Sequence, residues 1–218
     1  RAFAEACRNP EPAQALRLRR FLEANASTAY GRAHDYASIR SVRDFQAQMP
    51  VLTPEALAPW VARIAAGEPR VLTTAPVCIL ERTSGTTGTN GGDRLIPFTD
   101  PFLREMQGAL APWLADLYRA HPALRGLRQY WSISPATGPR ERTPGGLPIG
   151  MEDDTEYLGP LGRAALGRVM AVPGTLARTR ELDEWRRLTL VHLLATEDLG
   201  LISVWSPSFL TLLMEALE

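Results

Sequence analysis

The chain has 218 residues, of which 45% are hydrophobic and 22% are charged, a balance that is typical of a globular protein and excludes a disordered or fibrous one. All 24 basic residues are arginine, and they equal the 24 acidic residues in number, so no basic surplus indicates a nucleic-acid partner. Cys7 and Cys78 lie far apart without metal-ligand spacing, which favours neither a disulfide framework nor a zinc site. No apolar run reaches the roughly 18 residues of a membrane span, and we expect a cytoplasmic protein with no membrane partner.

The first third of the sequence predicts mainly helices. Apolar residues at helical spacing predict a helix over 13–24. Residues 28–38, which contain a glycine, are typical of a turn, and residues 40–50 predict a short helix that a proline stops. The clearest helix begins after Thr53, a residue type that caps helices, and Gly67 closes it.

Strands begin in the second part of the sequence. The β-branched runs at 70–73 and 76–81 predict two short strands. The second run leads directly into "ERTSGTTGTNGGDRLIPFT", residues 81–99, whose last five residues predict a returning strand. The glycine-rich stretch is therefore expected to be a loop between two strands. Thr99 or Asp100 is expected to cap the helix that follows.

The remaining elements alternate between strands and helices. They are, in chain order, a strand at 128–134, a Pro- and Gly-rich loop at 135–158, helices at about 159–171 and 180–196, a strand at 199–205 and a helix opened by Ser206 and Pro207. This alternation predicts an α/β fold. We expect residues 1–69 to be a mainly helical lead-in and residues 70–218 to be the α/β part, with mixed sheets covered by helices. Trp60, Trp113 and Trp185 fall on apolar helix stripes, which predicts that they belong to the core.

The glycine-rich loop has the composition of a phosphate-binding cradle. The Walker pattern requires a lysine, which this chain lacks, and the glycine spacing does not fit the dinucleotide fingerprint. Glycines nonetheless let consecutive backbone N–H groups turn toward one anion, and short hydroxyl side chains add donors. The predicted phosphate-binding residues of the loop are Ser84, Gly85, Thr86, Thr87 and Gly88. Arg94 at the loop exit is expected to close on the same oxygens with a forked pair of hydrogen bonds. An ordinary hairpin loop is the alternative, which explains the glycines but not the hydroxyl cluster.

The sequence resembles a known enzyme family over most of its length. The segment "RTSGTTG", a short gap and "RLIPFT" resemble the phosphate-binding loop of the adenylate-forming superfamily. Three flanking segments resemble the auxin-responsive Gretchen Hagen family of acyl acid amido synthetases, in its bacterial branch: "TAYGRAHDYASIRSVRDFQAQMPVLTPEALAPWVARIAAGEPRVLT", "TPGGLPIG" and "SVWSPSFLTLL". The resemblance runs from about Ala24 to the end of the chain. It implies the amino-terminal part of the large domain shared by acyl-CoA synthetases and luciferases.

The resemblance also implies a two-step reaction that uses ATP and Mg²⁺. A carboxylic acid attacks the α-phosphate to give an acyl adenylate and pyrophosphate, and an amine such as an amino acid then displaces AMP to form an amide. On this resemblance the residues of the loop wrap the β- and γ-phosphates, and Arg94 stands where the family carries its basic residue. The catalytic residues, the magnesium ligands and the carboxy-terminal domain are expected beyond residue 218. We therefore expect the chain alone to be an inactive fragment whose truncated edge favours self-association.

A second candidate site lies in the Pro- and Gly-rich loop. Arg140 and Arg142 are candidates to meet a substrate carboxylate, and Gly145 and Gly146 are candidates to form one wall of an acyl pocket. The alternative is that the two arginines are simply solvated in a polar loop.

Two other functions stay open at the level of the sequence. An acyl-CoA ligase would pass the acyl group to a thiol instead of an amine, and no residue here distinguishes the two acceptors. A catalytically silent nucleotide-binding or interaction domain is favoured by the missing lysine and by a gap after the glycines that is longer than the family's usual one.

Overall fold

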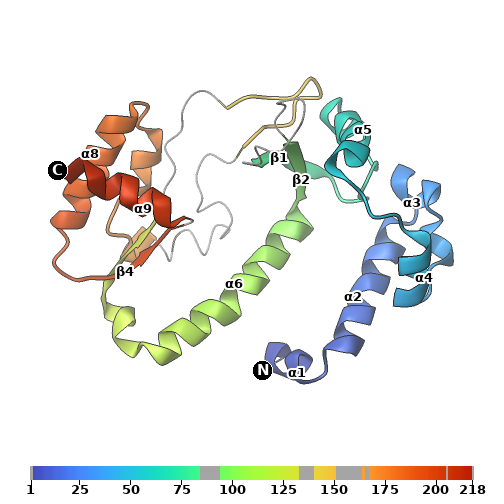
Figure 1. The fold of residues 1–218 in the computed structure, drawn as a ribbon, viewed down its shortest axis with the longest axis horizontal. Coiled ribbons are helices and arrows are strands. Elements are labelled where there is room, and N and C mark those ends of the chain that lie inside the picture. Colours follow the sequence, from blue (N-terminus) through green and yellow to red (C-terminus); the bar gives the residue numbers. More distant parts are fainter. Residues whose placement is uncertain are drawn as a thin grey trace. The chain divides into compact units, whose positions relative to one another are not determined.

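The structure is a computed structural model, and its contacts divide the chain into two compact units. It describes residues 2–83, 94–132, 140–150, 164, 167–204 and 206–217. The first unit comprises Arg1–Phe102 and Glu141–Gly150, and the second comprises Leu103–Arg140 and Met151–Glu218. Figure 1 shows the elements of both units.

Helices make up most of the first unit before its strands. They are α1 (Ala2–Arg8), α2 (Pro10–Asn25), α3 (Ala29–Ala33), the 3-10 turn η1 (Tyr36–Ser38), α4 (Val42–Gln48) and α5 (Pro54–Ala65). The predicted cap of α5 is confirmed, because the Thr53 side chain accepts a hydrogen bond from the N–H of Ala56. The predicted end is confirmed as well. Gly67, at φ +94°, donates to Ile64, and Glu68 donates to Arg63, which is the double hydrogen bond of a Schellman helix end.

Two predictions for this unit are wrong, and one contact explains both. Residues 28–38 were expected to form a turn but contain α3 and η1, and residues 70–73 were expected to form a strand but form none. The carbonyl oxygens of Arg70 and Val71 accept hydrogen bonds of 2.9 Å from the first two N–H groups of α3. A helix start leaves such N–H groups without intrahelical partners. The segment therefore completes a helix end instead of a sheet.

A hairpin carries the predicted glycine-rich stretch. The strands β1 (Val77–Thr83) and β2 (Arg94–Thr99) pair in antiparallel fashion, which confirms both predicted strands. The opposite edge of β1 bonds to a second segment. The N–H of Leu80 donates to Pro148 over 3.0 Å, and the N–H of Gly150 donates to Leu80 over 2.9 Å. β1 is thus bonded on both edges.

The core of the first unit lies between α5 and β1. Its buried members are Ile64, Val71 and Leu80, and Trp60 packs against them as predicted. Removal of these apolar side chains from water is the main favourable term available to hold α5 on the hairpin.

An aromatic cluster extends this core toward α3. The buried ring of Tyr30 lies 5.0 Å from Trp60, 4.2 Å from His34 and 6.1 Å from Tyr36, measured between ring centroids. Burial raises the pKa of Tyr36 to about 12, and the neighbouring Tyr30 adds to this rise. Burial also raises the pKa of Tyr30. The folded cluster therefore favours protonated phenols.

The helix α6 (Asp100–Ala120) follows β2 directly. Thr99 provides its cap, because its hydroxyl accepts from the N–H of Phe102 over 3.3 Å, which decides between the two predicted caps. The predicted core position of Trp113 is wrong, since 47% of this residue is exposed. Its ring contacts Trp131 edge-on, with 5.6 Å between centroids, and that contact covers one side only.

The second unit is built on two parallel strands. Their bounds, and those of the elements around them, are η2 (Pro122–Gly126), β3 (Arg128–Trp131), η4 (Gly174–Arg178), α8 (Leu182–Leu194), β4 (Leu199–Ser203), α9 (Pro207–Met214) and η5 (Glu215–Leu217). β3 pairs with β4 in parallel, as expected of strands joined through helices. The predicted helix at about 159–171 lies largely outside the described residues. Residues 167–169 are helical, and Met170 already bridges to Gln129.

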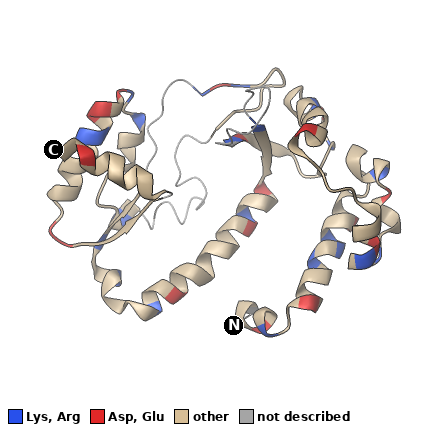
Figure 2. Cartoon of the chain, in the orientation of Figure 1, with Lys and Arg blue, Asp and Glu red and all other residues tan. Residues whose placement is uncertain are grey.

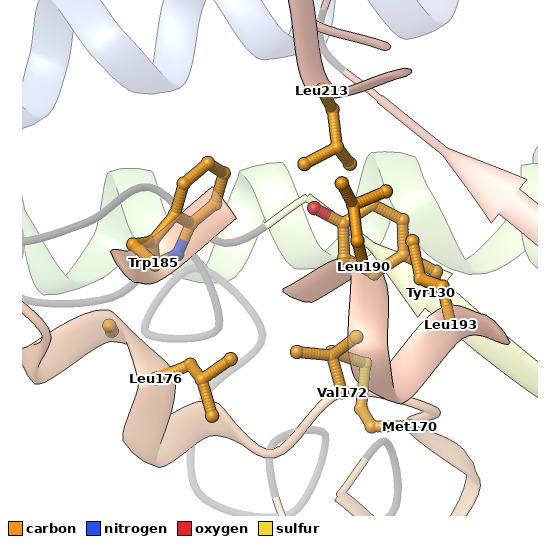
Figure 3. Close-up of a cluster of buried hydrophobic side chains, with 9 residues drawn as sticks. Tyr130, Met170, Val172, Leu176, Trp185, Leu190, Leu193 and Leu213 are labelled. Atoms are coloured by element: carbon orange, nitrogen blue, oxygen red, sulfur yellow. The ribbon is translucent and has the colours of Figure 1, made fainter. Parts of the chain in front are cut away.

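The core of the second unit packs α8 and α9 against β3 (Figure 3). Its buried members are Tyr130, Met170, Val172, Leu176, Ala177, Trp185, Leu190, Leu193 and Leu213. The predicted core position of Trp185 is confirmed, with 3% of the residue exposed. On the outer sides of the same helices, Leu194 is 70% and Leu212 is 49% exposed. Self-association through such apolar positions stays a prediction.

The aromatic cluster predicts how stability changes at high pH. Because the pKa of Tyr36 is raised on folding, its contribution is fully present below the unfolded value near 10 and is lost as the pH rises toward 12. Tyr36→Phe keeps the ring and removes the titrating hydroxyl. After discounting for partial exposure, we expect the drop in unfolding free energy between pH 9 and pH 12 to be smaller by about 1 to 2 kcal/mol in the variant.

Urea unfolding monitored at pH 7, 9, 10, 11 and 12 measures this difference, and the pH 7 pair serves as the control for any loss of packing. Parallel pH profiles for the two proteins would contradict the role given to Tyr36.

Candidate functional site

The hairpin ends bring the two sides of the predicted phosphate loop together. Thr83 and Arg94 are the terminal partners in the register of β1 and β2. Residues that pair across antiparallel strands have α-carbons about 5 Å apart, so the chain leaves and re-enters the sheet at one place. The two strands predicted on either side of the loop are confirmed. The predicted cradle residues 84–88 lie outside the described residues.

Arg94, the first described residue after the loop, contacts an acid that the sequence analysis did not connect with it. Its Nη2 lies 3.5 Å from Oε1 of Glu55, and 32% of the Arg94 side chain is exposed. Glu55 stands in the first turn of α5, directly after Pro54. A carboxylate is favoured there because the N-terminal end of a helix carries a partial positive charge.

The surroundings of Glu55 favour its ionised form. Its own backbone N–H and the Thr53 hydroxyl lower the pKa of this carboxyl, and the charge of Arg94 adds a smaller effect in the same direction. The ionised carboxylate is therefore favoured at this helix end before the charge of Arg94 is considered. Of the two side chains, that of Glu55 is 65% exposed and that of Arg94 is 32% exposed.

The pair leaves Arg94 able to bind an anion. A charge-assisted N–H···O contact is normally about 2.7 to 2.9 Å, and the separation here is longer. Among the described residues, no hydrogen bond of the Arg94 guanidinium accompanies this ion pair. A guanidinium has five N–H donors in a planar fork that matches phosphate oxygens, so Arg94 is chemically suited to the role predicted for it.

A second ion pair lies one residue before the end of β1. Arg82 contacts the carboxylate of Glu141, and their side chains are 42% and 64% exposed. The pair connects β1 to the segment 141–150, whose other bonds to β1 involve Leu80. At such exposure the pair adds little stability, and the backbone hydrogen bonds of Leu80 are what attach the segment to β1.

The predicted pocket glycines form a tight turn in this segment. The N–H of Gly146 donates to Thr143 over 2.8 Å, and Nη1 of Arg142 donates to the carbonyl of Gly146 over 2.7 Å. The turn thus brings together Arg142, Gly145 and Gly146. Arg140 is half-buried and belongs to the second compact unit. The Arg142 side chain is engaged in shaping the turn, which neither alternative considered for it had included.

Gly145 makes a close backbone contact with the end of α5. Its N–H donates to the carbonyl of Ala65 over 2.8 Å. A β-carbon at this position would lie 2.3 Å from the Gly67 nitrogen and 2.7 Å from the Ala66 carbonyl carbon. Only glycine fits this approach, so Gly145 has a packing role whether or not it faces a substrate.

Charged residues of both signs lie on the longer helices. Basic and acidic positions are interspersed along α6 (Figure 2), whereas α2 carries Arg17, Arg19 and Arg20 between Glu11 and Glu23. Within the described ranges, no group of three or more His, Cys, Asp or Glu side chains could hold a metal ion. In the same part of the chain, no helix is both long and apolar enough to cross a bilayer.

The family model of the GH3 family N-terminal domain matches residues 1–218. The chain belongs to the GH3 family. This confirms the family that the loop and its flanking segments indicated. A probable indole-3-acetic acid-amido synthetase, GH3.12 of Oryza sativa subsp. japonica, is 35% identical over 103 residues, which are 47% of this chain and 16% of the rice protein.

Solved structures of the same family share the fold. The structure titled "AtGH3.15 acyl acid amido synthetase in complex with 2,4-DB" superposes with a TM-score of 0.74 at 21% identity. A second structure of a GH3.15 acyl acid amido synthetase gives 0.69 at 19% identity. Each comparison covers 92% of this chain and 34% of the other. The expected mixed α/β fold of an amino-terminal part is thus confirmed, and this GH3 chain spans about a third of those structures.

Two acids of the candidate site were not predicted from the sequence. Glu55 and Glu141 each face an arginine that is far away in sequence. Their positions carry no local signal, because an acid in the first turn of a helix or in a polar loop is common on any surface. The packing of α5 against β2 brings Glu55 to Arg94, and the bonding of the segment 141–150 to β1 brings Glu141 to Arg82.

Gly145→Ala tests the close contact between the glycine turn and the end of α5. The added methyl group would overlap backbone atoms of Ala66 and Gly67, and overpacking of this kind costs about 1 to 3 kcal/mol. Gly108→Ala is the matched control, because a methyl group there meets no atom within 4 Å and lies inside α6, where alanine is favoured over glycine by about 0.5 to 1 kcal/mol. Chemical denaturation of both variants should give opposite signs, and an unaltered Gly145→Ala protein would refute the contact.

Proposed function

We propose that this GH3 chain is the phosphate-binding, amino-terminal part of an ATP-dependent acyl acid amido synthetase. Its substrates would be a carboxylic acid and an amine such as an amino acid. The observation that carries the proposal is the hairpin mouth, where Thr83 and Arg94 are register partners on either side of a segment rich in glycine, serine and threonine. Family membership and the names of the related proteins support the same class of reaction.

In the first proposed step, a carboxylate oxygen of the acid attacks the α-phosphorus of ATP. The new C–O–P linkage forms as the bond to the β-phosphate oxygen breaks, and pyrophosphate carries away the electron pair. Charge grows on the leaving pyrophosphate. Donors fixed around it beforehand lower the barrier because they need no reorganisation. Arg94 and the hydroxyl and amide groups of residues 84–88 are the donors proposed for this chain.

In the second proposed step, the amine nitrogen attacks the acyl carbon and AMP leaves, which forms an amide after loss of a proton. The names of the related proteins, which are amido synthetases, favour the amine over a thiol acceptor. Mg²⁺ is expected to accompany ATP. The described residues contain no group of three or more His, Cys, Asp or Glu side chains that could hold a metal ion, and no ligand of Mg²⁺ is proposed among them.

The experiment that tests the proposal is exchange of labelled pyrophosphate into ATP. The whole GH3 protein from which the chain derives should exchange label only when an acceptable carboxylic acid is present. The 218-residue chain should not, because catalysis requires every reacting group near its attack geometry and the chain is proposed to supply one side of the site. Exchange by the chain alone would show that the active site is divided elsewhere.

Product analysis with mixed amino acids or with coenzyme A then separates the alternatives. An amide product supports the proposal, a thioester supports an acyl-CoA ligase, and no acid-dependent exchange at all supports a silent nucleotide-binding domain.

Arg94→Ala tests the residue that faces the phosphates in this proposal. In the whole protein, kcat/KM for ATP should fall. The fall should correspond to a loss of about 2 to 4 kcal/mol of transition-state stabilisation, comparable to the loss of one preorganised donor. Arg82→Ala is a matched control, because Arg82 also lies next to the loop, near the end of β1, but pairs with Glu141. Steady-state kinetics that are equal for the wild type and Arg94→Ala would remove Arg94 from the site.

A further inference from the structure

The ion pair between Arg94 and Glu55 of α5 differs from a second ion pair at α5, which Arg63 forms with Glu68. At the far end of α5, Nε of Arg63 donates to Glu68 over 2.8 Å and its Nη2 donates over 2.5 Å. That pair has the two parallel hydrogen bonds of a tight fork. Arg94 and Glu55 instead share one contact of 3.5 Å. The pair at the hairpin mouth is built so that its arginine leaves easily.

The acid of the looser pair stands where a negative charge is favoured. Glu55 lies in the first turn of α5, beside the positive end of the helix, and Arg94 extends a long side chain from the first position of β2. A phosphate that binds Arg94 either draws the guanidinium off Glu55 or remains close to a permanent negative charge. Both effects weaken the binding of an anion to Arg94.

We propose that Glu55 is the counter-ion to which Arg94 returns, and that it lowers the affinity of the hairpin mouth for pyrophosphate. The inference rests on the proposed function only in taking Arg94 as a phosphate ligand. Glu55 is a positioning residue in this scheme, since it acts through Arg94 and touches no substrate. Its effect would be to favour release of the pyrophosphate that the first step produces.

The test is the binding of inorganic pyrophosphate to the full 218-residue chain, measured by isothermal titration calorimetry at pH 7. Glu55→Gln keeps the shape of the side chain and removes its charge. It should bind pyrophosphate about threefold to tenfold more tightly than the wild type. Glu68→Gln removes the same charge from the tight pair of α5 and should leave the affinity unchanged.

The double variant Glu55→Gln/Arg94→Ala shows whether the effect passes through Arg94. The gain from Glu55→Gln should vanish when Arg94 is absent, which a general change in surface charge or in helix stability would not produce. Weaker binding by Glu55→Gln, a gain that persists without Arg94, or no binding by the wild type and Glu55→Gln alike would overturn the proposal.

This result is separable from the test of the proposed function. Pyrophosphate binding that responds to Glu55 through Arg94 can be present in a protein that shows no acid-dependent exchange, in which case the synthetase function fails and the counter-ion role stands. Exchange without the Glu55 effect gives the reverse conclusion.

Discussion

The hydrogen bonding of β1 on both of its edges is the constraint on which the candidate site depends. Leu80, in the middle of the strand, is fully buried, and its main chain bonds to the segment around Pro148 while the strand as a whole pairs with β2. Buried backbone groups must find partners, so displacing either neighbour would leave some of them unpaired. The hairpin mouth and the glycine turn are therefore positioned by the same short strand.

Charge at the site contributes to specificity more than to stability. The side chains of Arg82 and Glu141 are 42% and 64% exposed, and those of Arg94 and Glu55 are 32% and 65% exposed. Ion pairs between exposed side chains contribute little to folding because water screens them. Each acid instead favours the guanidinium positions that lie close to it, which biases the forked donors toward the strand end. A chain without lysine has only this planar cation available for the purpose.

The sequence predicted several elements from local signals, and it failed where a distant contact decided the structure, as for the β-branched run at 70–73, which forms no strand. The start of α5 at Thr53 and the two strands of the hairpin were predictable because a cap residue and β-branched runs act on their own neighbours. The short helix α3 was not, since helices of this length are marginal alone and α3 depends on carbonyl groups of Arg70 and Val71. The pairing of Glu55 with Arg94 was missed for the same reason. Trp113 has the right helical spacing for a core residue, but spacing does not reveal whether a neighbour covers both sides of a ring.

The helix α5 also determines how the two candidate groups can share a ligand. One end holds Glu55 beside Arg94, and the other accepts the Gly145 N–H at Ala65. Ten residues of α-helix separate Glu55 from Ala65, which corresponds to roughly 15 Å at 1.5 Å per residue. A single phosphate group cannot reach both ends of such a rod. If the hairpin mouth binds the β- and γ-phosphates, the glycine turn is left to face a different part of the bound molecules, and this division agrees with a phosphate role for Arg94 and an acyl-side role for the turn.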